Sequence, residues 1–260
     1  MTFLETVLLS AIAGVTICLG LPVGRLRNLS TRTQAILTTA AGGVILFLIW
    51  DILSQAVEPV EATLTAARDG AGSIGAFAVN VIAFAGSISI GLLSLVWLTG
   101  RIKARRTEGI GPRDIALGTA IGLGLHNLSE GLAIGQSAAT GATSFALLLV
   151  IGFALHNATE GFGIAAPMTT GDRPTWRYLG FLGLVGGGPT FVGGVIGYTV
   201  VSPLASIVFL GLAAGALIFV FNEMMATSRK FAQPMAASAA LLVGLLVAFG
   251  TDFLLVAVGA

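Results

Sequence analysis

Eight long apolar runs dominate the sequence and leave little chain between them. They fall at roughly residues 3–22, 35–55, 73–99, 115–138, 144–168, 178–200, 204–227 and 234–257. An α-helix needs about 20 apolar residues to cross the hydrocarbon core of a bilayer, so each run predicts one membrane-spanning helix. The runs are continuous and do not alternate, which argues against a β-barrel. We therefore predict one all-α integral membrane domain over residues 1–260, with no folded soluble domain.

The composition agrees with a membrane protein and argues against other classes. Hydrophobic residues make up 55% of the chain and charged residues 10%, whereas soluble domains carry about 25% charged residues. A net charge of +1, with basic residues confined to short loops, argues against nucleic-acid binding. The one cysteine, Cys18, excludes an intramolecular disulfide and a cysteine-rich metal site. The first run lacks a basic n-region and carries Glu5, so we interpret it as a membrane span and not as a cleaved signal peptide.

Lysine and arginine collect in alternate loops. Twelve of the thirteen basic residues fall in the first, third, fifth and seventh loops: Arg25, Arg27, Arg32, Arg101, Lys103, Arg105, Arg106, Arg113, Arg173, Arg177, Arg229 and Lys230. The second loop instead holds Glu58, Glu61 and Asp69 with one Arg68. Because basic loops stay in the cytoplasm, both termini are expected outside, in a multi-pass protein of the cell (inner or plasma) membrane.

Both histidines of the chain open the same six-residue pattern. HNLSEG spans residues 126–131 and HNATEG spans residues 156–161, near the middle of the fourth and fifth runs. Residues three and four apart on a helix are neighbours, so the His, Asn and Glu of each pattern project into one wedge. The short loop near 139–143 makes the two helices antiparallel and lets the two wedges face each other at mid-membrane.

A facing pair of such wedges has the composition of a divalent-metal site. Charged side chains are costly inside a bilayer and usually mark a pathway or a site. Imidazole favours Zn, Fe, Cu or Ni, and carboxylate and amide oxygens accept harder ions. Mg²⁺ prefers carboxylates and retained water, so histidines are unusual ligands for it. The predicted metal ligands are His126, Asn127, Glu130, His156, Asn157 and Glu160, and the pattern leaves open whether one ion or two bind.

Other interpretations of these residues stay open at this point. Each histidine could hydrogen-bond its own glutamate and simply join two helices. An intramembrane metallohydrolase would need an open metal position and a general base, although the chain has no H-E-x-x-H and no third histidine. A proton-coupled carrier of an organic solute could use His and Glu as a relay. The neighbouring glycines, Gly131 with Gly135 and Gly161 with Gly163, fit close helix packing as well as a role in shaping a path.

At these motifs the sequence resembles the ZIP (Zrt-, Irt-like protein) family of divalent-metal transporters, of the bacterial or archaeal type and over its whole length. The family's fourth span typically reads H-N-x-P-E-G, and bacterial zinc-uptake members repeat nearly the same pattern in the fifth. The resemblance implies a transporter and not an enzyme, without a prosthetic group, and with Zn²⁺, Fe²⁺, Mn²⁺ or Cd²⁺ as transported substrate. It also implies eight helices in a 3+2+3 inverted-repeat arrangement. The glycine-rich helix faces are compatible with a homodimer.

The resemblance further implies acids along an import route. The family's second-span H-x-x-P-E-A is replaced by Asp51-Ile52-Leu53-Ser54-Gln55-Ala56, which makes Asp51 the entrance acid, expected near the outer face. In the seventh span, GALIFVFNEMM contains Glu223, the acid expected near the cytoplasmic mouth. Asp252, in the outer half of the last span, fits a packing partner and an entrance residue equally well.

The chain departs from the family pattern inside both motifs. Ser129 and Thr159 take the place of proline, so a kink would need hydroxyl back-bonding or glycine. Gly188-Pro189 stands where many bacterial members have Glu-Pro, which removes one ligand of a second ion. Because histidine and glutamate must lose protons to bind metal, we expect uptake to fall at acidic pH.

Overall fold

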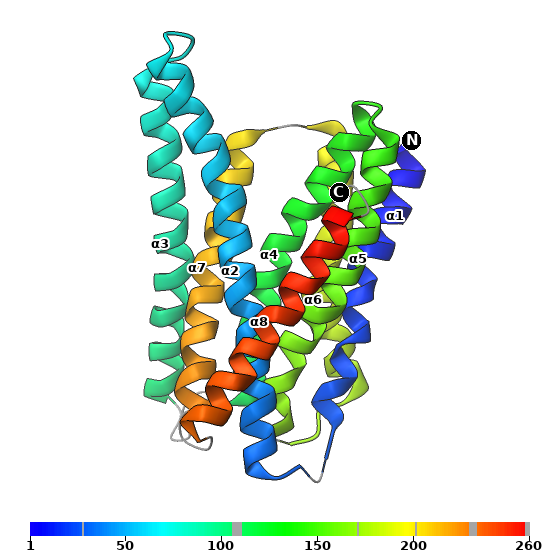
Figure 1. Ribbon diagram of the computed structural model, residues 1–260, viewed down its shortest axis with the longest axis vertical. Helices are drawn as coiled ribbons and strands as arrows, with labels where there is room; N and C mark the ends of the chain where they lie inside the picture. Colours follow the sequence, from blue (N-terminus) through cyan, green and yellow to red (C-terminus); the bar gives the residue numbers. More distant parts are fainter. Residues whose placement is uncertain (28, 106–110, 171, 201, 229–232, 258–260) are drawn as a thin grey trace.

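The computed structural model describes residues 1–27, 29–105, 111–170, 172–200, 202–228 and 233–257 (Figure 1). Within these ranges only the backbone is described for Leu98, Thr99, Ile102, Lys103, Ala104, Arg105, Leu148, His156, Thr227, Ser228, Leu254, Leu255 and Val256. The α-helices are α1 (Phe3–Val15), α2 (Thr31–Arg68), α3 (Ile74–Arg105), α4 (Pro112–Ala139), α5 (Thr143–Ala165), α6 (Trp176–Thr199), α7 (Pro203–Ser228) and α8 (Pro234–Ala257). Short 3₁₀ segments extend α1, as η1 (Thr16–Leu19) and η2 (Leu21–Arg25), and α5, as η3 (Ala166–Thr170).

Each predicted apolar run forms one of these helices, and no strand occurs among the described residues, so the all-α membrane fold is confirmed. In the described part of the chain, seven helical segments are long and apolar enough to cross a membrane, and α4 is not among them. Its middle carries the polar side chains of HNLSE (residues 126–130), which lower its hydropathy. The neighbours α1, α5, α6 and α7 pack around it. That α4 spans the membrane stays a prediction, as does a single domain over residues 1–260.

Two helices continue well beyond the C-terminal ends of their apolar runs. α2 continues to Arg68 instead of ending near residue 55, and α3 continues to Arg105 instead of ending near residue 99. Glutamate, lysine and arginine are good helix formers, so the helix persists beyond the point at which the apolar run stops. The loop assignment was therefore wrong for charged residues on the extensions of α2 and α3, namely Glu58, Glu61, Arg68, Arg101, Lys103 and Arg105. It was also wrong for Arg32, Arg113 and Arg177, which lie in the first turns of α2, α4 and α6.

Proline and hydroxyl side chains mark where helices begin. Proline is favoured in the first turn because its missing N–H has no helical partner there and its fixed φ suits the helix. Prolines at the first helical position are Pro112, Pro203 and Pro234. Hydroxyl side chains accept a hydrogen bond from the backbone N–H three residues later, and the residues that do so are Thr2, Ser30 and Thr175.

The helices pack as two groups of four (Figure 1). One group consists of α1, α4, α5 and α6, and the other consists of α2, α3, α7 and α8. The groups meet where α4 contacts α7 and where α5 contacts α2 and α8. The polar motifs of α4 and α5 therefore belong to helices that form the seam between the groups. This grouping cuts across the 3+2+3 division, and the inverted-repeat relation itself stays a prediction.

The chain termini lie toward one end of the bundle, and the loops that were predicted to be basic lie at the other (Figure 1). At that basic end three arginines lie over aromatic rings. The distance from the guanidinium carbon to the ring centroid is 4.5 Å for Arg25 over Trp176 and for Arg101 over Trp97. It is 5.7 Å for Arg113 over Tyr178. Tryptophan and tyrosine gather at membrane–water boundaries, and arginine pairs favourably with their faces. These pairs mark the basic end as a membrane boundary. Its assignment to the cytoplasm stays a prediction.

Glycines let α4 and α6 approach each other backbone to backbone. A Cβ at Gly131 of α4 would overlap the carbonyl oxygen of Thr190, and a Cβ at Gly193 of α6 would overlap the carbonyl oxygen of Leu128. Small residues at such crossings are how membrane helices gain close van der Waals contact. The crossing fixes the position of α4, and with it the side chains of the first motif.

We expect Gly193→Ala to destabilise the protein, because the added methyl group must push α6 away from α4. The cost should be about 1–3 kcal/mol, typical of overpacking a tight interior. Gly180→Ala, on the same helix and with open space at the Cβ position, should be neutral or slightly stabilising, since alanine is the better helix former. Thermal unfolding of the purified protein in detergent compares the two. Equal melting temperatures for both variants would contradict the close approach.

Candidate metal centre

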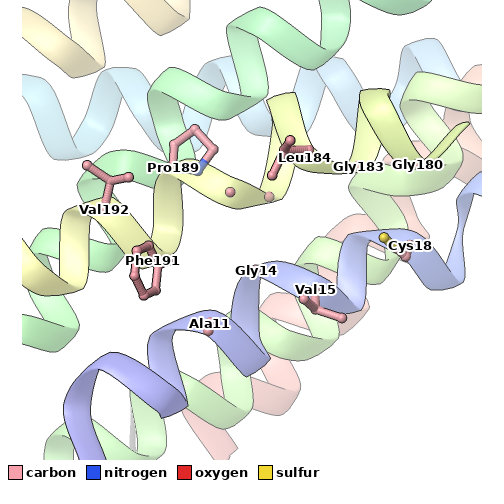
Figure 2. A pocket seen from close by; sticks show the side chains of 12 residues that line it. Ala11, Gly14, Val15, Cys18, Gly180, Gly183, Leu184, Pro189, Phe191 and Val192 are labelled. Carbon is pink, nitrogen blue, oxygen red and sulfur yellow. The ribbon is translucent and has the colours of Figure 1, made fainter. Parts of the chain in front are cut away.

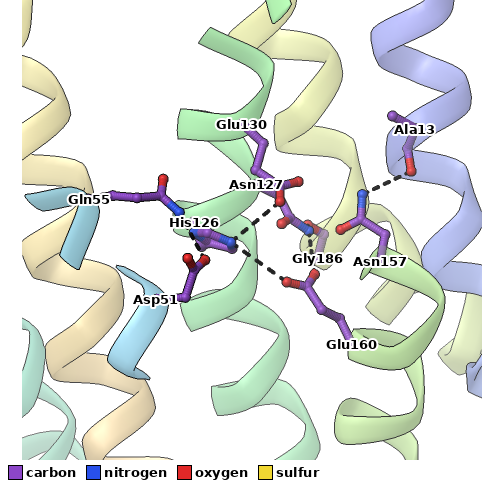
Figure 3. A network of polar contacts seen from close by, with 9 residues as sticks. All are labelled: Ala13, Asp51, Gln55, His126, Asn127, Glu130, Asn157, Glu160 and Gly186. Carbon is purple, nitrogen blue, oxygen red and sulfur yellow. Dashed lines mark hydrogen bonds and ion pairs between the residues drawn. The ribbon is translucent and has the colours of Figure 1, made fainter. Parts of the chain in front are cut away.

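The two motifs meet at the seam between the helix groups (Figure 3). The chain turns between α4 and α5 at Gly141, whose φ of 83° favours glycine, and the two helices run antiparallel as predicted. The predicted ligands whose side chains the structure describes are all buried: His126, Asn127, Glu130, Asn157 and Glu160. The side chain of His156 lies outside the described residues, although its backbone continues α5. The structure thus brings together five of the six predicted ligands, whose binding role stays a prediction.

His126 lies between two carboxylates. Its Nε2 is 3.5 Å from Glu130 Oε1, one turn along the same helix, and 3.9 Å from Glu160 Oε1 of α5. His126 is 1% exposed and Glu160 is fully buried. Two acids and one imidazole in so dry a place are stable only when each has partners of opposite or complementary charge.

The two asparagines have a fixed orientation. Asn127 Nδ2 donates to Glu160 Oε2 at 2.9 Å and to the carbonyl oxygen of Gly186 at 3.0 Å, and Asn157 Nδ2 donates to the carbonyl oxygen of Ala13 at 2.9 Å. A backbone carbonyl can only accept, so each amide must turn its nitrogen toward that carbonyl and its oxygen the other way. The orientation of both amides therefore follows from chemistry, even though N and O look alike in shape.

Several buried oxygens in this cluster meet no hydrogen-bond donor among the described residues. They are Asn127 Oδ1, Asn157 Oδ1 and Glu130 Oε2. A buried polar atom without a partner costs about 1–3 kcal/mol, and roughly 90% or more of buried backbone groups in proteins are paired. Three acceptors of this kind, in side chains that belong to one cluster, are free to bind a cation or water molecules.

The spacing of the donors suits a cation of moderate size. Two donors bound to one tetrahedral ion at about 2.0–2.2 Å stand roughly 3.3–3.6 Å apart. The 3.5 Å between His126 and Glu130 lies in this range, and the 3.9 Å between His126 and Glu160 lies slightly above it. Within the described part of the chain, no three His, Cys, Asp or Glu side chains already form a metal-holding group. The other oxygens of the cluster belong to the amides of Asn127 and Asn157, and asparagine is not one of those four residue types.

The glycine that ends each motif serves helix packing. Gly131 backs onto α6, and a Cβ at Gly161 would overlap the carbonyl oxygen of Ile17 in η1. The glutamate that precedes each glycine is buried in the cluster, and the glycine itself contacts the neighbouring helix. Back-bonding of the Ser129 hydroxyl, one route to the expected kink, is not observed, because its Oγ has no hydrogen-bond partner among the described residues.

Asp51 lies deeper than the sequence indicated. It stands 20 residues after the first residue of α2 and 17 before the last (31–68), and Figure 3 places its carboxylate beside His126. Its charge is close enough to act on His126, Glu130 and Glu160. The expectation that it lies near the outer face was wrong, because α2 extends well beyond its apolar run.

Gln55 is a member of this cluster that the sequence analysis did not propose. Its Nε2 donates to Asp51 Oδ2 at 2.8 Å, and its side chain extends from α2 toward His126 (Figure 3). The sequence signal that indicates this contact is the i,i+4 spacing of Asp51 and Gln55 within an apolar run. The carbonyl partners Ala13 and Gly186 left no signal in the sequence, because any residue supplies a carbonyl.

The other expected residues lie on α6, α7 and α8. Glu223 is partly buried in α7, five residues before the helix ends at Ser228. Asp252 of α8 is close enough to feel the charge of Asp51. Gly188 lines an apolar groove of about 600 Å³ between α1 and α6 (Figure 2). The groove has no charged lining residue, and Cys18 is its one thiol, so it lacks the ligands that the cluster offers.

Comparison with known proteins identifies a family. The family model described as "ZIP Zinc transporter" matches residues 100–252, more than half of the 260 residues. The match includes both motifs and all of α4, α5, α6 and α7, whereas α2 with Asp51 lies outside it. No curated protein is significantly similar to the chain.

We expect Asn157→Asp to weaken the contact between α5 and α1, although the substitution adds a negative charge to the candidate cation site. A carboxylate cannot donate to Ala13 O, so two acceptors would face each other at a cost of about 1–3 kcal/mol. Thermal unfolding without added metal measures this cost. Asn222→Asp, at an exposed position of α7, is the matched control. If both variants melt with the wild type, the amide orientation assigned to Asn157 is wrong.

Proposed function

The chain belongs to the ZIP zinc transporter family, whose members move divalent metal cations across membranes, and we propose that it imports Zn²⁺ into the cytoplasm through the cluster of α4 and α5. Membership favours a transporter over the metallohydrolase and the organic-solute carrier considered above. The metal is cargo, so no resident prosthetic group is needed. The proposed ligands are His126, Asn127, Glu130, His156, Asn157 and Glu160.

One observation carries this proposal: the oxygens of Asn127 and Asn157 are buried without donors while their nitrogens are held by carbonyls. A simple pairing of each histidine with its own glutamate would leave these oxygens orphaned at a cost in stability. A divalent cation satisfies them and also offsets the charges of Glu130 and Glu160. The cluster is therefore better explained as an ion site than as a joint between two helices.

The donor types favour Zn²⁺ among the candidate ions. Imidazole suits Zn²⁺ and Fe²⁺, and the carboxylate and amide oxygens also tolerate Mn²⁺ and Cd²⁺. No thiolate belongs to the described cluster, and the one cysteine of the chain lines the groove between α1 and α6. We propose Zn²⁺ as the substrate, with Fe²⁺, Mn²⁺ and Cd²⁺ as competitors.

The proposed direction rests on charge. The arginine-rich end of the bundle is the cytoplasmic one by the positive-inside rule, which assigns the termini to the outer side of the cell membrane. Glu223 lies near the end of α7 that leads toward the arginine-rich side, where it would take the ion on its way out of the cluster. Weakly binding acids in series allow an ion to leave each site.

Transport through the cluster predicts that His126→Ala combined with Glu160→Ala abolishes most Zn²⁺ uptake by proteoliposomes. The double variant removes one imidazole and one buried carboxylate, and loss of ligands typically lowers metal affinity by more than the roughly 10–100-fold of outer-shell changes. Glu61→Gln, which neutralises an exposed acid of α2, is the matched control and should retain uptake. Zn²⁺-dependent fluorescence inside the vesicles gives the rate, and competition with Fe²⁺, Mn²⁺ and Cd²⁺ ranks the ions.

Undiminished flux in the double variant would end this proposal. Flux lost equally in the Glu61→Gln control would mean that the loss reflects general charge and not the cluster. Vesicles with the arginine-rich end facing inward test direction: Zn²⁺ should enter them down its gradient and should bind first from the side of the termini.

A further inference from the structure

The apolar groove between α1 and α6 opens onto the outer surface of the protein (Figure 2). Its floor is made of glycine: a Cβ at Gly14 would overlap the carbonyl oxygen of Gly187, so the two backbones touch there. Val15 and Leu184 line the groove and are 66% and 70% exposed. Both helices are long and apolar enough to cross a membrane, so the open side of the groove faces lipid.

The groove has about the length of one leaflet of a bilayer. Its lining on α6 runs from Gly180 to Val192, which is about 18 Å along a helix axis. Half of the hydrocarbon core of a bilayer is about 15 Å thick. Gly180 lies one turn after Trp176, whose pairing with arginine marks the membrane boundary at the basic end. The groove therefore extends from near that boundary toward mid-membrane, the depth that an acyl chain of that leaflet occupies.

An arginine lies where the groove meets this boundary. Trp176 and Gly180 are four residues apart, so they share one face of α6. The Arg25 guanidinium lies over the Trp176 ring and donates a hydrogen bond to the backbone carbonyl oxygen of Pro174. These two contacts hold the positive charge of Arg25 at the basic end of the groove.

Further positive charge surrounds Arg25. Arg27 and Arg173 are close enough for their charges to act on it, and Arg173 is exposed. Asp172 is the one acid of residues 171–177. Among the described residues, no carboxylate forms an ion pair with Arg25 or Arg173. Arginine binds phosphate through strong, charge-assisted hydrogen bonds, so this end of the groove suits the phosphate of a lipid.

The same charge disfavours a second copy of the chain as the occupant. Copies that associate within a membrane share one orientation, and a two-fold axis along the membrane normal would place the same groove residues of both copies together. Arg25 and Arg173 would then face their own equivalents, and like charges repel. An anionic lipid instead matches the groove with its acyl chain and the arginines with its phosphate.

We propose that the groove between α1 and α6 binds an anionic phospholipid, with one acyl chain in the groove and its phosphate at Arg25 and Arg173. The lipid comes from the leaflet at the basic end. The positive-inside rule predicts that this is the cytoplasmic leaflet, whose surface is negatively charged because of its anionic lipids. This lipid site goes beyond the proposed transport function and does not rest on it.

A lipid in this groove supports the helix contact that orients the central asparagines. Gly14 and Gly187 of the floor directly follow Ala13 and Gly186 in the chain. The carbonyls of Ala13 and Gly186 accept the hydrogen bonds of the two asparagines. An acyl chain that contacts both α1 and α6 therefore stabilises the pair of helices that carries these carbonyls.

Lipid binding to the purified full chain tests the role of charge. The delipidated protein in detergent is titrated with phosphatidylglycerol, or with phosphatidylcholine of the same acyl chains, and native mass spectrometry counts the bound lipids. Each basic residue near anionic lipid strengthens binding about fivefold, so Arg25→Gln combined with Arg173→Gln should weaken phosphatidylglycerol binding about tenfold or more. Arg101→Gln, which removes an arginine over Trp97 at the same end, is the matched control and should bind like the wild type.

Cys18 reports whether the lipid lies in the groove. It is the one cysteine of the chain and lines the groove, so its modification by N-ethylmaleimide measures access there without any substitution. At a phosphatidylglycerol concentration about ten times the Kd, modification should slow about tenfold. Gly180→Leu should weaken lipid binding by filling the groove, and Gly86→Leu on α3 should not, although both positions have open space for a Cβ.

Three outcomes would overturn the proposal. The first is equal binding of phosphatidylglycerol and phosphatidylcholine by the wild type, or equal losses in the double arginine variant and Arg101→Gln. The second is a rate of Cys18 modification that phosphatidylglycerol does not change. The third is a lipid-free dimer in which Cys18 is protected, which would assign the groove to a second copy. None of these measurements uses Zn²⁺, so they are separable from a failure of the proposed transport function.

Discussion

Two backbone carbonyls fix the orientation of the two asparagines at the centre of this protein. The carbonyls of Ala13 and Gly186 accept hydrogen bonds from the amide groups of Asn157 and Asn127 and so fix which way each amide is turned. The same bonds join α5 to α1 and α4 to α6, which ties the orientation of the ligands to the packing of the helices. A shift of α1 or α6 would therefore change the orientation of Asn157 or Asn127, and a substitution of either asparagine would change the packing.

Close helix contact and acid burial are linked within each motif. Gly131 and Gly161 allow a neighbouring backbone to approach, and the preceding Glu130 and Glu160 are buried in the cluster. Burying two carboxylates costs several kcal/mol per ion unless charge partners are present. The close glycine contacts provide a framework that holds those acids near each other.

The sequence predicted the helices and the meeting of the two motifs, because both follow from periodicity and from a short turn. It did not predict the length of α2, since glutamate and arginine continue a helix that hydrophobicity alone would end. The predicted position of Asp51 near the outer face was wrong for that reason. The hydrogen bond from Asn157 to Ala13 could not be predicted from the sequence, because it depends on where α1 packs against α5 and no residue type indicates it.

The polar middle of α4 has a consequence for how the protein is made. On insertion scales, charged residues near a helix centre cost about 2.5–3.5 kcal/mol each, and α4 carries Glu130 as well as His126 there. This helix is a poor candidate for stable entry into the bilayer by itself. If α4 spans the membrane as predicted, we expect it to enter the lipid together with α5 and α6, whose side chains and carbonyls shield those groups. Assembly of the polar cluster and integration of α4 would then be a single biogenesis step.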